Sequence, residues 1–159
     1  MGTDRPKRKT PAHLPAIQRF NTSIVVFVTV CTARRAPILA RGRAHETLLS
    51  AWQEARLWGV GRYVLMPDHI HMFCSPMEWE CPALGEWIKY WKSIVSRKWP
   101  WPDEHPIWQR SFWDRQLRTG ESYAAKWHYV RHNPVRKGFV ATPDEWPYQG
   151  EMHVLEWHD

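Results

Sequence analysis

The chain has 159 residues, enough for about one domain, and 43% of them are hydrophobic and 24% charged, as in soluble globular domains. It contains no run of about 18 apolar residues, which excludes a membrane-spanning helix, and its three cysteines are too irregularly spaced for a disulfide scaffold, which favours the cytoplasm. The 22 basic and 16 acidic residues give a net charge of +6, which indicates an anionic partner, most commonly nucleic acid.

The first part of the chain is expected to be a flexible basic arm over residues 1–20, which are rich in Pro, Lys and Arg and hold too few apolar side chains for a core. Residues 21–32 form a β-branched run that predicts the first strand. Residues 44–58 have apolar side chains at helical spacing, with Gly59 after them as a stop signal, and predict a helix that ends at Trp58.

The later elements are predicted from turn residues and apolar spacing. In chain order they are a strand over residues 61–66, a strand over 69–75, a helix over 84–99, an ambiguous short strand and bend over 107–117, and a helix over 121–133 that Pro134 ends. This order predicts a single α+β domain over residues 21–150, with a ferredoxin-like antiparallel sheet and helices packed mainly on one face. Residues 151–159 are expected to be an acidic tail.

The segment Met66-Pro67-Asp68-His69-Ile70-His71 places two histidines two residues apart on a predicted strand. Side chains alternate along a strand, so His69 and His71 point to one face and Ile70 to the other, under the helices. Two imidazoles on one face can converge on one cation, although a pair of half-exposed histidines on a sheet explains the pattern equally well.

Tyr129 and Asn133 lie four residues apart on the last predicted helix, which makes their side chains neighbours. The amide oxygen of Asn133 is suited to hard cations. A core tyrosine followed by a helix-capping asparagine is the structural alternative. His128 and His132 have the same spacing and form a rival metal pair, which we rank below His69 and His71.

Aromatic and basic residues alternate in the segment 108–118. Arginine forks bind phosphate and indole rings stack on unpaired bases, so Trp113, Arg115 and Arg118 are candidate contacts to single-stranded DNA. Three further basic residues on the predicted helices complete the candidate phosphate contacts, namely Lys89, Lys92 and Arg131.

Three motifs in this order, MPDHIH at residues 66–71, FWDRQLR at 112–118 and YVRHNPVRKG at 129–138, resemble the single-tyrosine HUH transposases of the insertion-sequence-200-like superfamily, and most of all the REP-associated tyrosine transposases. The resemblance implies an antiparallel sheet flanked by helices and a divalent metal, Mg²⁺ or Mn²⁺. By position it makes His69, His71 and Asn133 the metal ligands and Tyr129 the nucleophile.

Two departures from the family pattern accompany this resemblance. Residues 21–24 read Asn-Thr-Ser-Ile where REP-associated members usually carry Gly-Thr-Trp-Tyr, which leaves recognition of REP-type palindromes open. Asp68 stands before the first histidine, where the family commonly has Asn.

The function predicted is a metal-dependent single-stranded DNA endonuclease and strand transferase, which cleaves through a 5′-phosphotyrosine intermediate and needs no nucleotide fuel. Its partner is expected to be single-stranded DNA, with a hairpin or palindrome beside the cleavage point, and the protein is expected to act as a monomer or a homodimer. A nucleic-acid-binding protein without chemistry is the first alternative. A metal-dependent hydrolase that uses an activated water is the second.

Overall fold

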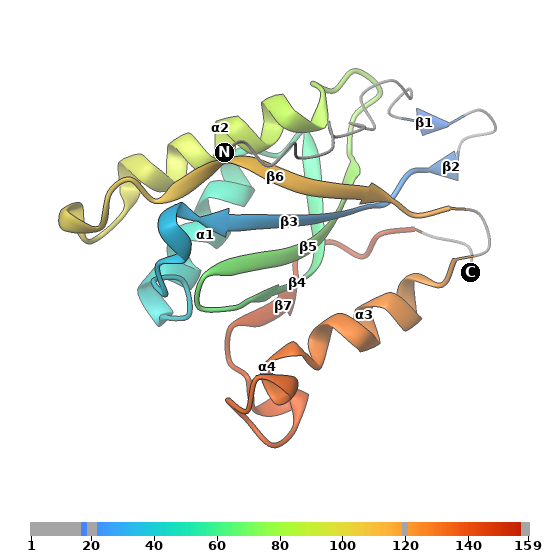
Figure 1. Cartoon of the computed structure of the whole chain (residues 1–159). Helices are drawn as coiled ribbons and strands as arrows, with labels where there is room; N and C mark the ends of the chain where they lie inside the picture. Colours follow the sequence, from blue (N-terminus) through green and yellow to red (C-terminus); the bar gives the residue numbers. More distant parts are fainter. Residues whose placement is uncertain (1–16, 19–21, 119–120, 157–159) are drawn as a thin grey trace, which may run out of the picture.

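The computed structural model describes residues 17–18, 22–118 and 121–156. Its centre is a five-stranded antiparallel sheet in the order β6-β3-β5-β4-β7 (Figure 1). In chain order its strands are β3 (Val26–Thr32), β4 (Trp58–Leu65), β5 (His69–Pro76), β6 (Trp108–Gln116) and β7 (Gln149–Glu151). A separate pair joins β1 (Ile17–Gln18) to β2 (Thr22–Ser23); most of the predicted arm over residues 1–20, and residues 157–159 of the predicted tail, lie outside the described residues.

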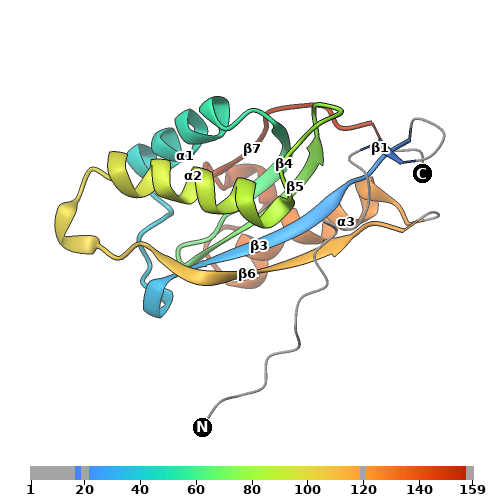
Figure 2. The ribbon, with the colours of Figure 1, turned by 90° about the horizontal axis from the view of Figure 1, so that it is seen from above.

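Two helices cover one face of the sheet and a third covers the other. Helix α1 (Gly42–Glu54) connects β3 to β4, and α2 (Leu84–Lys98) connects β5 to β6. Together these elements form the β-α-β-β-α-β order of a ferredoxin-like fold, so the predicted fold class is confirmed. Helix α3 (Tyr123–Arg131) and the short α4 (Asn133–Arg136) lie under the opposite face (Figures 1 and 2).

The main core fills the space between the sheet and the helices α1 and α2. Alternate residues of β3 and β5 point into it, and the tryptophans Trp52, Trp87 and Trp91 of the two helices are at most 2% exposed. The buried stripe predicted for the second helix is therefore correct. A smaller apolar cluster, which includes Phe73, Val130 and Trp146, lies on the α3 side of the sheet.

The boundary between the first helix and the next strand differs from the prediction. Helix α1 ends at Glu54, and Trp58 and Gly59 belong to β4. Trp58 is 4% exposed and lies in the core, as the helical pattern predicted. Burial alone therefore did not distinguish a helix from a strand at this position. Gly59 lies within the strand rather than acting as a stop, and a Cβ there would lie 2.5 Å from the sulfur of the exposed Met77 side chain.

The C-terminal part also differs from the prediction. Helix α3 ends at Arg131, and the chain starts a new helical turn in which Pro134 occupies the first turn, where a proline costs no hydrogen bond. The predicted domain end at residue 150 falls inside β7, which pairs with β4, and Leu155 beyond it is buried. The ordered domain therefore includes part of the predicted acidic tail, because edge pairing does not require apolar residues.

Candidate active site

The two histidines of β5 lie side by side on the face of the sheet that α1 and α2 leave uncovered. In the antiparallel register His71 is opposite Thr29 and His69 is opposite Cys31 of β3. Their ring centroids are 4.7 Å apart. Ile70 belongs to the main core on the opposite face, so the predicted division of the strand is confirmed.

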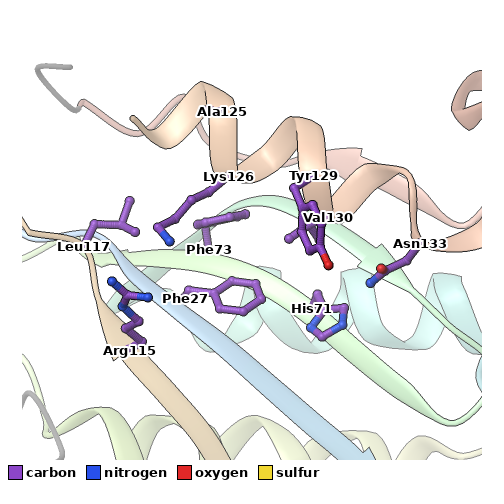
Figure 3. Close-up of a pocket in the computed structure, with 10 residues that line it drawn as sticks. All are labelled: Phe27, His71, Phe73, Arg115, Leu117, Ala125, Lys126, Tyr129, Val130 and Asn133. Carbon is purple, nitrogen blue, oxygen red and sulfur yellow. The ribbon is translucent and has the colours of Figure 1, made fainter. Parts of the chain in front are cut away.

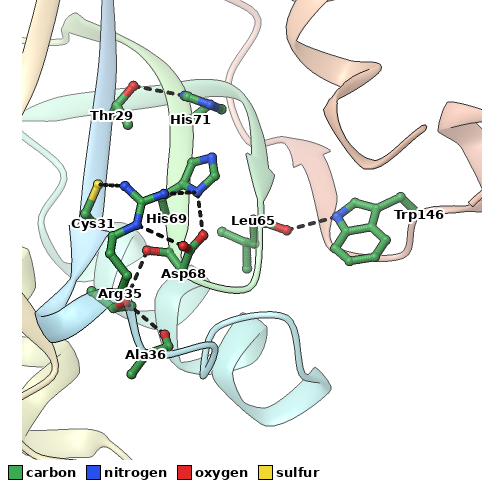
Figure 4. A network of polar contacts seen from close by, with 10 residues as sticks. Thr29, Cys31, Arg35, Ala36, Leu65, Asp68, His69, His71 and Trp146 are labelled. Carbon is green, nitrogen blue, oxygen red and sulfur yellow. Dashed lines mark hydrogen bonds and ion pairs between the residues drawn. The ribbon is translucent and has the colours of Figure 1, made fainter. Parts of the chain in front are cut away.

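Each imidazole is held through its Nδ1 atom. The Nδ1 of His69 lies 2.7 Å from Oδ1 of Asp68, and the Nδ1 of His71 lies 2.9 Å from Oγ1 of Thr29 (Figure 4). A carboxylate can only accept a hydrogen bond, so neutral His69 carries its proton on Nδ1 and presents the lone pair of Nε2. Hydrogen bonds of this kind orient histidines that bind metals through the other nitrogen.

Arg35 is a member of this network that the sequence did not single out. Its Nε donates to Oδ2 of Asp68 at 2.8 Å, and its Nη1 donates to the sulfur of Cys31 at 3.2 Å. The backbone of Arg35 is left-handed, with φ of 55°. Such a conformation is costly for a residue with a side chain, and it occurs where the surrounding structure holds it. Arg35 thus fixes the carboxylate that orients His69.

Burial keeps both histidines neutral. Desolvation lowers the pKa of His71 to about 3, and the nearby charges of His69, Arg136 and Arg35 add to the shift. Desolvation also lowers the pKa of His69, although its hydrogen bond to Asp68 acts in the opposite direction. A neutral imidazole is the form that coordinates a metal, so the pair is ready for a cation at physiological pH.

A pocket of about 510 Å³ brings His71 together with Tyr129 and Asn133 (Figure 3). Tyr129 extends from α3 and is 68% exposed, and its hydroxyl points towards the side of the pocket where His71 and Asn133 lie. The structural alternative of a core tyrosine is therefore wrong for Tyr129.

Arg136 contacts both residues that α3 and α4 contribute to this site. Its guanidinium carbon is 4.1 Å from the centroid of the Tyr129 ring, and its Nη2 donates to Oδ1 of Asn133. A positive charge is therefore held over the phenol. The sequence signal for Arg136 was its place in the YVRHNPVRKG motif, where no role was assigned to it.

The donor set of a metal at this site would be mixed. Among residues 17–18, 22–118 and 121–156, no three His, Cys, Asp or Glu side chains are grouped so that they could hold a metal ion. The two imidazoles and the amide oxygen of Asn133 are the donors that remain. The rival pair, His128 and His132, has ring centroids 4.5 Å apart, but neither residue lines the pocket that contains Tyr129 and Asn133.

The candidate DNA contacts divide between the two faces. Trp113 and Arg115 of β6 are opposite Thr29 and Phe27 of β3, which places them on the histidine side. Arg118 follows the same strand and is exposed. Arg131, from α3, pairs with Asp144.

Lys89 and Lys92 lie on the other side of the sheet, in a groove between α2 and β6. Lys89 is exposed, but Lys92 is only 9% exposed, and its Nζ donates to the carbonyls of Gln109 at 2.9 Å and Ser111 at 3.4 Å. The prediction that Lys92 lies on the surface is therefore wrong, and its role as a phosphate contact stays a prediction. The helical pattern placed it on the surface because the position of β6 beside α2 is not visible in the spacing.

No helix in the described part of the chain combines the length and apolar character that crossing a membrane requires.

No protein-family model matches the chain. Two relatives are similar in sequence: a protein of Haemophilus influenzae named "Putative REP-associated tyrosine transposase", 31% identical over 58% of this chain, and the REP-associated tyrosine transposase of Escherichia coli, 25% identical over 58% of this chain. The chain spans less than two thirds of either relative, 62% and 54% respectively.

Two solved structures share the fold. A REP-associated tyrosine transposase bound to a REP hairpin superimposes with a TM-score of 0.67 at 23% identity, over 83% of this chain and 79% of the other. A putative transposase from Deinococcus radiodurans gives a TM-score of 0.51 at 13% identity, over 72% and 94%. At these identities the likeness establishes the fold, which agrees with the ferredoxin-like arrangement described above.

Proposed function

We propose that this homologue of the REP-associated tyrosine transposases is a metal-dependent single-stranded DNA endonuclease and strand transferase, which cleaves through a 5′-phosphotyrosine intermediate. One observation carries the proposal: a single pocket contains an exposed tyrosine, a neutral, partly buried histidine of an HxH pair and an asparagine. These are the groups that attack on a phosphodiester by a phenol requires, namely a nucleophile and ligands for a cation.

The residues present fit a divalent metal, Mg²⁺ or Mn²⁺. His69 and His71 have their Nδ1 atoms engaged and would hold it through Nε2, and Asn133 would supply an oxygen once Arg136 releases it. When bound, such a cation polarises the phosphate and neutralises its charge. Imidazole suits Mn²⁺ better than Mg²⁺, so manganese is expected to support the reaction at least as well.

The chain's own residues perform the transfer. The Tyr129 oxygen forms a bond to phosphorus and the bond from phosphorus to the 3′ oxygen breaks. The phenolic proton is lost to solvent, and the departing 3′ oxygen takes a proton from solvent to become a free 3′-hydroxyl. Arg136 holds positive charge over the Tyr129 ring, which favours the negatively charged form of the phenol. One phosphodiester is replaced by another ester of similar energy, so a second 3′-hydroxyl can reverse the step and join strands.

The substrate proposed is single-stranded DNA with a hairpin or palindrome beside the cleavage point, on which the protein acts in the cytoplasm. The related structure with a REP hairpin supports this choice, as do the exposed Trp113 and Arg115 on the same face as the pocket. One chain supplies both His71 and Tyr129 to the pocket, which supports delivery of the tyrosine within one chain, whether the protein acts as a monomer or a homodimer.

The test is the covalent adduct itself. The protein is incubated with a library of labelled single-stranded hairpins in Mg²⁺ or Mn²⁺, and label that stays on the protein in denaturing gels is measured. Tyr129→Phe should abolish the adduct and keep DNA binding, and His71→Ala should abolish it as well. Tyr90→Phe, which changes another exposed tyrosine, this one on α2, is the matched control and should leave the adduct unchanged.

The other outcomes identify the alternatives. Cleavage that persists in Tyr129→Phe and fails in His71→Ala would mean a hydrolase that uses an activated water. Salt-sensitive DNA binding without any cleavage, even in Mn²⁺, would mean a binding protein without chemistry.

A further inference from the structure

The pocket beside Tyr129 has an apolar part that the proposed chemistry does not use. Five of its lining residues are apolar, and they come from the sheet, from the end of β6 and from α3: Phe27, Phe73, Leu117, Ala125 and Val130. Phe27 is half-buried there, stacked on His71 with ring centroids 5.4 Å apart. The volume of about 510 Å³ is within the range of small-ligand sites.

Two cations stand at the end of the pocket away from Asn133. Figure 3 shows Arg115 and Lys126 together at that end, beyond Phe27 and Phe73, with Tyr129 and Asn133 at the other. Both pair with the same carboxylate, that of Glu121, at 3.1 Å and 3.2 Å. Two positive charges share one negative charge, and the side chain of Arg115 is still 58% exposed, so this end of the pocket attracts an anion.

A ligand that satisfies both parts is flat, apolar on its faces and attached to phosphate. We propose that the pocket binds the base of the nucleotide adjacent to the bond that Tyr129 attacks, while Arg115 and Lys126 contact the DNA backbone of the same strand. This inference rests on the proposed function and adds a base-binding subsite to it. Such a base must leave the stack, which a single strand allows and a duplex resists.

Stacking and apolar contact, rather than hydrogen bonds to base edges, dominate this subsite. Apart from Arg115 and Lys126 at one end and the candidate catalytic residues at the other, the lining offers only apolar side chains. The subsite is therefore expected to require the presence of a base more strictly than its identity.

Ala125 gives a direct way to close the subsite without replacing a candidate catalytic residue. It is an exposed residue of α3 that lines the pocket, and Leu at this position would fill the space while keeping a strong helix former. Ala124 is its neighbour on the same helix, is also exposed and is not among the lining residues. Ala124→Leu is therefore a matched control for the added bulk.

The experiment compares two probes by fluorescence anisotropy without added metal: an oligothymidylate of about 16 residues, and an abasic strand with the same number of phosphates. Wild type should bind the first more tightly. Ala125→Leu should weaken its binding roughly 5- to 150-fold, the range for loss of one stacked base, and leave the abasic strand unaffected. Ala124→Leu should change the binding of neither probe, and Arg115→Ala should weaken the binding of both.

Any of three results refutes the subsite. The first is that wild type binds both probes equally tightly, and the second is that Ala125→Leu binds oligothymidylate as tightly as wild type does. The third result is that Ala124→Leu loses as much affinity for oligothymidylate as Ala125→Leu. The outcome is independent of the adduct assay. Base-dependent binding without an adduct would refute the proposed chemistry and keep the subsite, and an adduct with base-independent binding would do the reverse.

Discussion

The two faces of the central sheet differ although the same strands form both. On the α1 and α2 face, alternate residues of β3 and β5 are completely buried under tryptophans. On the other face the intervening residues of these strands include Thr29, His69 and His71, and Phe27, His71 and Phe73 line the pocket between this face and α3. Strand alternation therefore separates stability from chemistry within single strands, and substitutions on the two faces should have different consequences.

Replacement of Trp91 by Ala should have the largest effect on stability. Its ring is completely buried, and the ring centroid lies 5.8 Å from that of Trp52 and 5.5 Å from that of Trp108. The variant should therefore lose about 3–5 kcal/mol in the free energy of unfolding. Tyr129→Ala, on the other face, removes an exposed ring whose main contact is Arg136, and should lose no more than about 1 kcal/mol. Urea unfolding of both variants measures the contrast, and equal losses would contradict it.

Lys92 sharpens the comparison because it is a charged residue on the buried face. Lys92→Met keeps the apolar stem and removes the ammonium that donates to the β6 carbonyls, so it should lower the free energy of unfolding by about 1–3 kcal/mol. Lys89→Met, one turn away and exposed, should change it by less than about 0.5 kcal/mol. If Lys92→Met unfolds like wild type but binds DNA more weakly, the phosphate contact predicted from the sequence is correct.

Local sequence patterns predicted most of the core on the α1 and α2 face and the orientation of the histidines. The alternation in residues 69–75 was sufficient to place His69 and His71 opposite Ile70, and the stripe of residues 84–99 was sufficient for α2. These features depend on periods of 2.0 and 3.6 residues, which are properties of the sequence alone.

The features that sequence did not predict depend on contacts between distant segments. Arg35 reaches Asp68 across 33 positions, and β7 pairs with β4, far away in the chain. Arg35 also needs a left-handed backbone that its residue type does not indicate. The presence of Tyr129 and His71 in one pocket was predicted only through the resemblance to a family, because spacing within α3 says nothing about its distance from β5.

The histidine face of the sheet should also make the stability of the protein depend on pH. The pKa of His71 is about 3 in the folded protein and near 6.5 when unfolded, so the unfolded state binds the additional proton between these values. Stability is therefore complete above pH 6.5 and falls as the pH is lowered towards 3. Between pH 7.5 and pH 5.5 the contribution of His71 should fall by about 1.4 kcal/mol.

The measurement is urea unfolding of the metal-free protein in chelator at both pH values, for wild type and His71→Gln. Burial also lowers the pKa values of His69 and His45, so the variant keeps part of the pH dependence. The decisive quantity is how much more unfolding free energy wild type loses on acidification than His71→Gln does, because that difference comes from one imidazole. If wild type and His71→Gln lose the same stability on acidification, His71 takes up its proton in the folded state, and the neutral ligand pair inferred for this face does not exist at pH 5.5.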